Sequence, residues 1–461
     1  MELLELYYDV LIKIIEEVEP EDLAALAQTS IGFNHFVKGN EMLYKAHYLK
    51  NFDDPRRRPT DPAPDWIAEL QRLVKLRKIL QSQSPDVKSA NMDFVLETIS
   101  TLIKTGTESE GLSLNCGELT KLFSNPQNAD MFMHRSSLYR RAGMETQSQA
   151  QSLETRQQSA RLHSIYGIPN DSTGRRTLST HPFARSRVYD LRNYSKRSRW
   201  GPFRNDGSMR VDWELVESIM VVLGYNNGIC SRRYMDRFVL PWSAPFANIF
   251  QDRFAHLPFT DLQPPLPSLT KEPSLPLDFQ DPYNVSGIWA RIVCFLDYDD
   301  LYDFNFNTTA VRTPEDQPLP PITMEEAVRH IMMHLEVTAV TAPGKNDNQT
   351  MPVIHFDGKA RAVDTNMDAN ANSSIRGCVR MTPEGEVRWS TVWIFNGHEE
   401  RWRSEAIQVG GLRSKRGVVG VWYDKSFDPH GPAGPTAFWK VKELASGTDE
   451  DGNDSDDFME L

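Results

Sequence analysis

The first fifty residues carry apolar side chains at helical spacing. These side chains recur in steps of three and four, with charged residues between them: Val10, Leu11, Ile14, Ile15 and Val18. This periodicity predicts an amphipathic helix. Pro20 and Asp22 suit the start of a second helix, Ser30 suits the N-cap of a third, and a fourth follows around Leu43. Four short helices are too small to bury all of this apolar surface themselves, so the pattern predicts that part of it binds another protein.

From about Tyr283 the apolar positions change to a period of two residues, which is typical of strands. The clearest pair is 387–395 and 401–409, and Asn396-Gly397 between them favours a hairpin turn. Further strands are predicted at 288–295, 335–340, 353–356, 375–381, 417–423 and 437–441. About eight antiparallel strands form either a closed barrel or a sandwich, and the pattern leaves both open.

The region between these two ends is predicted to be mainly helical. Prolines interrupt the chain at 53–64, helical spacing resumes at Trp66, and a further helix is predicted at 212–224. A proline-rich linker is predicted at 257–282. The fold class is therefore α+β, with four predicted regions: helices at 1–50, an α-helical middle region at 65–256, a β-rich module at 283–445 and a disordered acidic tail at 446–461.

The register from Leu6 to Leu23 resembles the F-box family, although Tyr7 stands where that family usually has proline and Ile31-Gly32 replaces a frequent basic pair. The resemblance implies binding to a Skp-type adaptor and, through it, to a cullin and ubiquitin transfer. It implies that these side chains bind the adaptor: Leu6, Val10, Leu11, Ile14, Ile15, Pro20, Leu23, Leu26, Phe33, Val37, Leu43 and Tyr44. The alternative is a four-helix cap packed on its own domain.

The segments 188–194, 200–203, 210–213 and 397–440 are similar to fungal F-box proteins with a β-rich C-terminal module. The C-terminal part also resembles the lipocalin-like barrel of some animal F-box receptors, in which the barrel selects the protein to be ubiquitinated. The candidate target-binding residues are Trp389, Trp393, Arg401, Arg403, Trp422, His430 and Trp439.

The residues themselves leave the roles of these candidates open. The face with Trp389 and Trp393 is core in a sandwich and pocket lining in an open barrel. Arg401 and Arg403 project to the same side of their predicted strand and can bind the carboxylate of an acidic or phosphorylated degron. They can equally pair with neighbouring glutamates.

Composition narrows the choice of partners. The formal net charge is -12, and the last 14 residues supply seven of the acids and no base, so the remainder is mildly acidic and unsuited to general polyanion binding. There is no apolar run of 18 residues and no signal-peptide pattern at the start, so we expect no membrane contact and a cytoplasmic or nuclear location. Four widely spaced cysteines predict reduced thiols.

Sequence motifs for catalysis or metal binding are weak. His355 with Asp357 supplies two ligands without a third, and the acids at 297–303 lack the glycine and final glutamate of a calcium loop. The phosphate-loop, serine-hydrolase and zinc-protease motifs are missing from the sequence. We therefore predict no catalytic residue, metal or cofactor.

A basic, aromatic stretch spans 175–204. The favoured interpretation is a wrapping loop whose arginines pair with the protein's own acids. Binding of an acidic or phosphorylated peptide comes second, and nucleic acid comes last.

Together these features predict the substrate-recognition subunit of a Skp–cullin–F-box ubiquitin ligase, without catalytic residues of its own. Two alternatives stay open: a scaffold that uses the adaptor without a cullin, and a β-barrel small-ligand binder or enzyme with an attached F-box. The target and its degron are not identified by the sequence.

Overall fold

The computed structural model of the chain describes residues 5–56, 61–108, 113–144, 151–169, 176–234, 238–249, 251–252, 276–314, 317–363 and 372–442. These residues form two compact units. Unit 1 comprises Met1–Met133 with Phe250–His256, and unit 2 comprises His134–Ile249 with Leu257–Leu461. The predicted middle region 65–256 is thus divided between the two units. The predicted acidic tail lies outside the described residues, as does most of the predicted linker.

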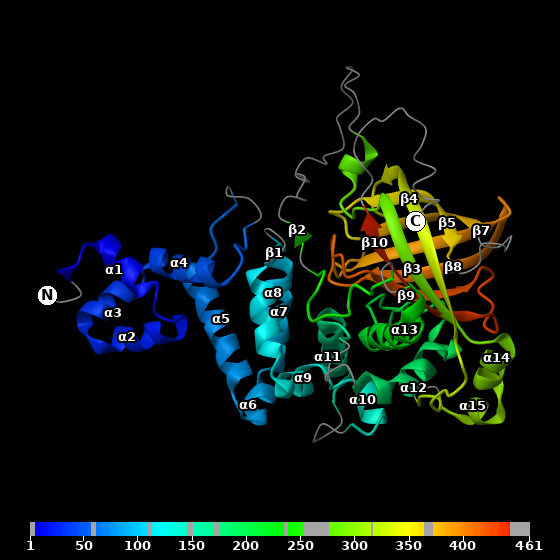
Figure 1. The fold of residues 1–461 in the computed structure, drawn as a ribbon, viewed down its shortest axis with the longest axis horizontal. Helices are drawn as coiled ribbons and strands as arrows, with labels where there is room; N and C mark the ends of the chain where they lie inside the picture. The colour runs from blue at the N-terminus through cyan, green and yellow to red at the C-terminus, as the bar shows by residue number, and fades with distance from the viewer. Residues whose placement is uncertain are drawn as a thin grey trace, which may run out of the picture. The chain divides into compact units, whose positions relative to one another are not determined.

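Unit 1 is helical, apart from a two-stranded parallel pair of β1 (Thr107–Glu108) with β2 (Gln251–Asp252). Its helices are, in chain order, α1 (Tyr8–Ile15), the 3₁₀ helix η2 (Pro20–Asp22), α2 (Leu23–Thr29), α3 (Ile31–Val37), α4 (Glu41–Asn51), α5 (Trp66–Gln81), α6 (Pro85–Ala90), α7 (Met92–Thr105), α8 (Leu114–Phe123) and α9 (Pro126–Phe132), and Figure 1 labels α1 to α9. The predicted N-cap is confirmed, because Ser30 Oγ accepts a hydrogen bond from the Phe33 N–H at 3.1 Å.

Unit 2 contains a closed antiparallel barrel in the strand order β10-β3-β4-β5-β6-β7-β8-β9. The strands are β3 (Gly287–Phe295), β4 (Ala327–Thr341), β5 (Val353–Ala362), β6 (Asn372–Met381), β7 (Val387–Phe395), β8 (Glu399–Gln408), β9 (Val418–Asp424) and β10 (Ala433–Lys442). Because β10 pairs with both β9 and β3, the sheet closes. Of the two architectures that the sequence left open, the fold is therefore the barrel. The hairpin at Asn396-Gly397 is confirmed, and both residues have the positive φ that a tight hairpin turn requires.

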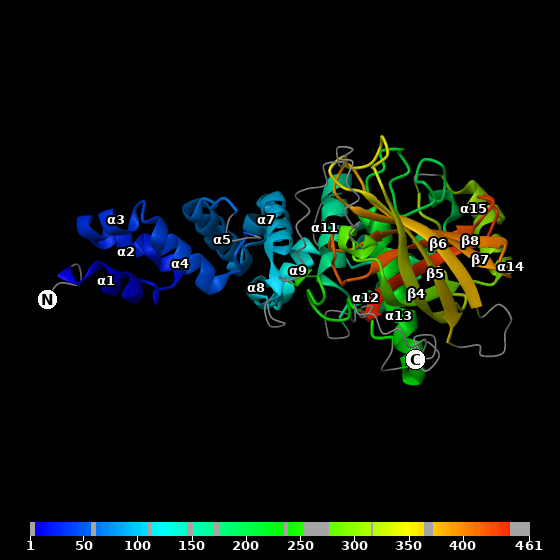
Figure 2. The same ribbon diagram turned by 90° about the horizontal axis from the view of Figure 1, so that it is seen from above.

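Helices cover one side of this barrel. They are α10 (Ser137–Arg141), α11 (Leu153–Tyr166), α12 (Arg176–Val188) and α13 (Trp213–Tyr234), while α14 (Tyr298–Phe306) and α15 (Thr308–Arg312) follow β3; the short 3₁₀ helices are η3 (Leu191–Asn193) and η6 (Leu277–Gln280). In both views α13 lies against the barrel and α12 lies beside α13 (Figure 1, Figure 2). The outer faces of β3, β9 and β10 share a buried apolar cluster with α13, so barrel and helices form one core.

A buried arginine fastens the loop between β8 and β9 to the helical layer. The side chain of Arg416 is fully buried, and its Nη2 donates to the carbonyls of Ile165 and Tyr166. Its Nη1 donates to the carbonyls of Pro241 and Ala244 at 3.2 and 3.3 Å. These four hydrogen bonds to backbone carbonyls hold the loop in place against segments 165–166 and 241–244.

No helix in the part of the chain that the structure describes is both long enough and apolar enough to span a membrane.

Candidate functional site

The twelve predicted adaptor-binding side chains divide by burial. Six of them lie inside unit 1: Leu11, Ile15, Pro20, Leu23, Val37 and Leu43. Four are half-buried: Leu6, Leu26, Phe33 and Tyr44. Val10 and Ile14 are exposed on α1. The buried members hold the four short helices together, since each fully buried aliphatic side chain contributes roughly 1.5–3 kcal/mol.

Unit 1 exposes several large apolar side chains that the sequence pattern did not select. Together with Val10 and Ile14 we call them the exposed apolar set: Tyr7, Val10, Ile14, Ile31 and Met42. Tyr7 is 87% exposed and Ile31 is 80% exposed, although both are large and apolar. These two positions are also where the sequence departs from the F-box pattern. The departures therefore lie on the surface, where they alter contacts with a partner and leave the core unchanged.

Three of these predicted residues also line a groove within unit 1. Pro20, Leu23 and Tyr44 face Leu70 and other side chains of α5 and α6 across a space of about 460 Å³. The groove walls are mainly aliphatic. The groove thus lies between the first four helices and α5.

The barrel interior is filled with aromatic side chains near its centre. Trp389 is fully buried and lies 5.2 Å from Trp289, 5.4 Å from Phe438 and 5.5 Å from Phe356, measured between ring centroids. Its indole N–H donates to Gln408 Oε1 at 3.3 Å. Trp389 is therefore core, and we call these four rings the aromatic plug.

Trp393 and Trp422 also lie inside the barrel and are buried. The indole N–H of Trp393 donates to Thr391 Oγ1 at 3.2 Å, and that of Trp422 donates to the Cys294 carbonyl at 3.0 Å. Both tryptophans have satisfied donors within the fold. Neither of these two tryptophans therefore has an indole N–H left to donate to a ligand.

Trp439 lies outside the barrel, beneath the helical layer. Its ring meets those of Trp242 and Phe238 edge to face, at 6.1 and 6.3 Å between centroids. His430 lies in the exposed loop between β9 and β10, with its ring 4.7 Å from that of Phe306 on α14. The aromatic candidates therefore do not converge on one site.

Arg401 and Arg403 pair with glutamates of their own strand. Arg401 Nη2 lies 2.8 Å from Glu399 Oε2, and Arg403 Nη2 lies 3.2 Å from Glu400 Oε2. A register shift between Trp393 and Ile394 interrupts the pairing of β7 with β8. The two guanidiniums consequently stack on different rings, Phe395 and Phe427. Of the two roles that the sequence left open for these arginines, pairing with neighbouring glutamates is the one observed.

Four arginines of the basic stretch pair with the protein's own acids, as the favoured interpretation predicts. The pairs are Arg185–Glu326, Arg187–Asp212, Arg192–Asp190 and Arg204–Glu154, at 2.9, 2.7, 2.7 and 3.2 Å. The expected wrapping loop was wrong in part, because residues 176–188 form helix α12. The other weak motifs are structural: Asp297 caps α14, and His355 Nε2 lies 3.0 Å from Thr341 Oγ1. The described residues contain no cluster of three potential metal ligands.

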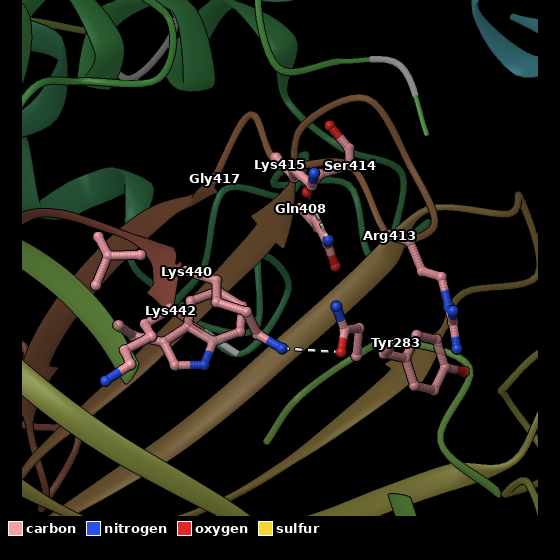
Figure 3. A pocket seen from close by; sticks show the side chains of 11 residues that line it. Tyr283, Gln408, Arg413, Ser414, Lys415, Gly417, Lys440 and Lys442 are labelled. Carbon is pink, nitrogen blue, oxygen red and sulfur yellow. Dashed lines mark hydrogen bonds between the residues drawn. The ribbon is translucent and has the colours of Figure 1, made fainter. Parts of the chain in front are cut away.

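A cationic pocket of about 220 Å³ lies where β3 begins and β10 ends. Figure 3 shows the side chains around it. Eleven described residues line it, and four of these are cations while none is acidic: Arg413, Lys415, Lys440 and Lys442. The sequence signal that was passed over is the basic run Arg413-Ser-Lys-Arg416, followed by Lys440 and Lys442 at the end of the last strand.

The family comparison identifies an F-box domain at residues 3–45. This match covers the exposed apolar set and the buried side chains that support it. Comparison with curated proteins and with solved structures gives no match for this chain.

Proposed function

We propose that this protein is the substrate-recognition subunit of a Skp–cullin–F-box ubiquitin ligase, with the F-box bound to a Skp-type adaptor and unit 2 bound to the target. The F-box domain at residues 3–45 carries this proposal. F-box domains bind Skp-type adaptors, and the exposed apolar set supplies surface for such a contact.

The proposed complex needs no catalytic group from this chain. A receptor that holds a target lysine near a charged ubiquitin carrier raises the effective concentration of the two reactants, and this accelerates transfer by proximity. Cytoplasm or nucleus is the compartment we propose, and the four cysteines, which form no disulfide, suit a reducing environment.

Adaptor binding is tested with charged substitutions in the exposed apolar set. Val10→Glu with Ile14→Glu should weaken binding of a purified Skp-type adaptor by a factor of roughly 100 or more, because two apolar side chains that are already on the surface become charged. Folding should be preserved, since neither side chain is buried. The matched control is Leu153→Glu with Val311→Glu, two exposed apolar residues of unit 2.

Equal adaptor binding by the test and control variants would refute the F-box interface. Co-precipitation of a cullin with the adaptor then separates a ligase subunit from a scaffold. Recovery of adaptor without cullin would favour the scaffold alternative.

A further inference from the structure

A row of aromatic rings lies on α14 and on the loop between β9 and β10. Tyr298, Tyr302 and Phe306 are spaced four residues apart, so they follow one face of the helix. Their neighbouring ring centroids are 6.2 and 4.9 Å apart, and the ring of His430 lies 4.7 Å from that of Phe306. We call these four rings the aromatic ridge. In both views α14 lies at the edge of unit 2 (Figure 1, Figure 2).

The ridge is not the face by which α14 packs on its own unit. Leu301 and Phe304 are buried on another side of the helix, in a separate apolar cluster. Phe306 is half-buried and anchors the end of the row, whereas Tyr298 is 49% exposed and Tyr302 is 43% exposed. Single exposed aromatic residues are ordinary, but a continuous row of rings on the surface is typical of an interaction site.

Hydrogen bonds hold the helix and the loop in this arrangement. Tyr298 Oη donates to the His430 carbonyl at 3.4 Å. The side chain of Asp297 caps α14 by accepting the Asp299 backbone N–H at 3.0 Å. In the loop, the carboxylate of Asp428 accepts the His430 backbone N–H at 2.9 Å. The rings therefore belong to a structured surface.

Carboxylates flank the ridge. Asp299 and Asp303 each follow a ridge tyrosine by one residue, which places them about 100° around the helix from the rings. Both side chains are exposed, and neither carboxylate forms an ion pair with a residue that the structure describes. Segment 297–312 holds four acids and one base, Arg312. Aromatic faces and negative charge thus lie side by side.

An arginine side chain matches both parts of this surface. Its planar guanidinium stacks on an aromatic face and also donates hydrogen bonds to a carboxylate. The fold itself uses the stacking contact: Arg401 lies 5.0 Å from the Phe395 ring centroid, and Arg403 lies 5.3 Å from that of Phe427. Acidic peptides and nucleic acids would be repelled by the flanking carboxylates.

We propose that the aromatic ridge docks an arginine-rich, extended segment of a partner protein. Guanidiniums of this segment stack on Tyr298 and Tyr302 and bond to Asp299 and Asp303. Alternate residues of an extended chain lie roughly 6.6 Å apart on one face, which matches the 6.2 Å between the two tyrosine rings. That this partner is the ubiquitination target rests on the function proposed above.

The carboxylates are tested with a short fluorescent peptide, in which arginine alternates with serine, and the full-length chain. Asp299→Asn with Asp303→Asn should weaken peptide binding by about tenfold, because two exposed charges beside the ridge are lost. The matched control is Asp357→Asn with Glu384→Gln, two exposed acids of β5 and of the β6–β7 turn. It should change binding by less than about twofold.

Stacking is tested separately. Tyr302→Ala should weaken peptide binding by about threefold, and its matched control is Phe279→Ala, which removes a similarly exposed ring elsewhere in unit 2. A peptide with lysine in place of arginine should bind the natural chain more weakly, because an ammonium does not stack as a guanidinium does. This difference between the peptides should shrink in Tyr302→Ala. Thermal unfolding midpoints check that all variants fold.

Equal weakening by the ridge and control variants, equal binding of the arginine and lysine peptides, or no binding of the arginine peptide would overturn the proposal. Adaptor pull-down is a separate readout. Ridge-dependent peptide binding without recovery of adaptor refutes the ligase function and supports the ridge. Recovery of adaptor without ridge-dependent peptide binding refutes the ridge and leaves the ligase function standing.

Discussion

The two units use their apolar residues in opposite ways. The F-box helices of unit 1 are short and leave Tyr7 and Ile31 almost fully exposed. The barrel of unit 2 closes on itself, fills its centre with the aromatic plug and places cations at its end. The adaptor-binding surface that we propose on the first unit is therefore apolar and comes from incomplete burial. The second unit buries large aromatic side chains in the barrel and carries cations at the barrel end.

The largest effect is expected in the barrel. Trp389→Ala should lower the free energy of unfolding of unit 2 by roughly 3–5 kcal/mol, because a fully buried ring is removed from the aromatic plug. Calorimetry should show a lower unfolding temperature for unit 2. Adaptor binding should stay as in the natural chain, and its loss would contradict the division of roles between the units.

A similar or smaller loss of stability is expected from a substitution in the core of the F-box. Leu43→Ala should destabilise unit 1 by roughly 2–5 kcal/mol, since Leu43 is completely buried. Tyr7→Ala is the comparison within the same unit: it should leave unfolding unchanged and weaken adaptor binding. Urea unfolding and a binding titration measure the two properties. If both substitutions lower the free energy of unfolding equally, the exposed apolar set does not differ from the core as we describe.

Acid should destabilise unit 2 through a buried histidine. Burial lowers the pKa of His134 to about 3, so the unfolded chain, with an ordinary pKa near 6.5, binds the proton first as pH falls. Through this histidine the free energy of unfolding should fall by about 2 kcal/mol between pH 7 and pH 5. His134→Gln should flatten that part of the stability curve, measured by denaturant unfolding at each pH. An unchanged slope would exclude His134 as the cause.

The smallest effect is expected at the exposed ion pairs of the barrel. Arg403→Gln should change the free energy of unfolding by less than about 1 kcal/mol, because Arg403 and Glu400 are each about one third exposed and water screens their attraction. Urea unfolding measures the change, and a loss of several kcal/mol would contradict the argument that water screens this pair.

Local features were predictable from the sequence, and long-range geometry was not. The Ser30 cap and the Asn396-Gly397 turn depend on neighbouring residues, and both predictions were correct. The choice of barrel over sandwich depends on the pairing of β3 with β10, the first and last strands of the sheet, which periodicity does not report.

Several surroundings of the candidate residues could not be predicted from the sequence, for identifiable physical reasons. Alternation along β8 placed Arg401 and Arg403 together, but the irregular pairing with β7 is invisible in one strand's sequence. Trp439 is a candidate from the sequence, and its packing in the apolar cluster shared with α13 is a long-range contact that periodicity does not report. The buried F-box residues were recognised as apolar, yet periodicity does not distinguish a side chain that packs inside from one that faces a partner.

Closure of the barrel by its final strand has a consequence for synthesis. On the ribosome the F-box helices emerge early, whereas β3 and β9 keep unpaired edges until β10 is made. A nascent or prematurely terminated chain that lacks β10 would retain the F-box while exposing two strand edges to aggregation. Such a product would compete for adaptor without presenting a completed barrel, so a stop codon before residue 433 should act as a dominant inhibitor and not as a simple loss.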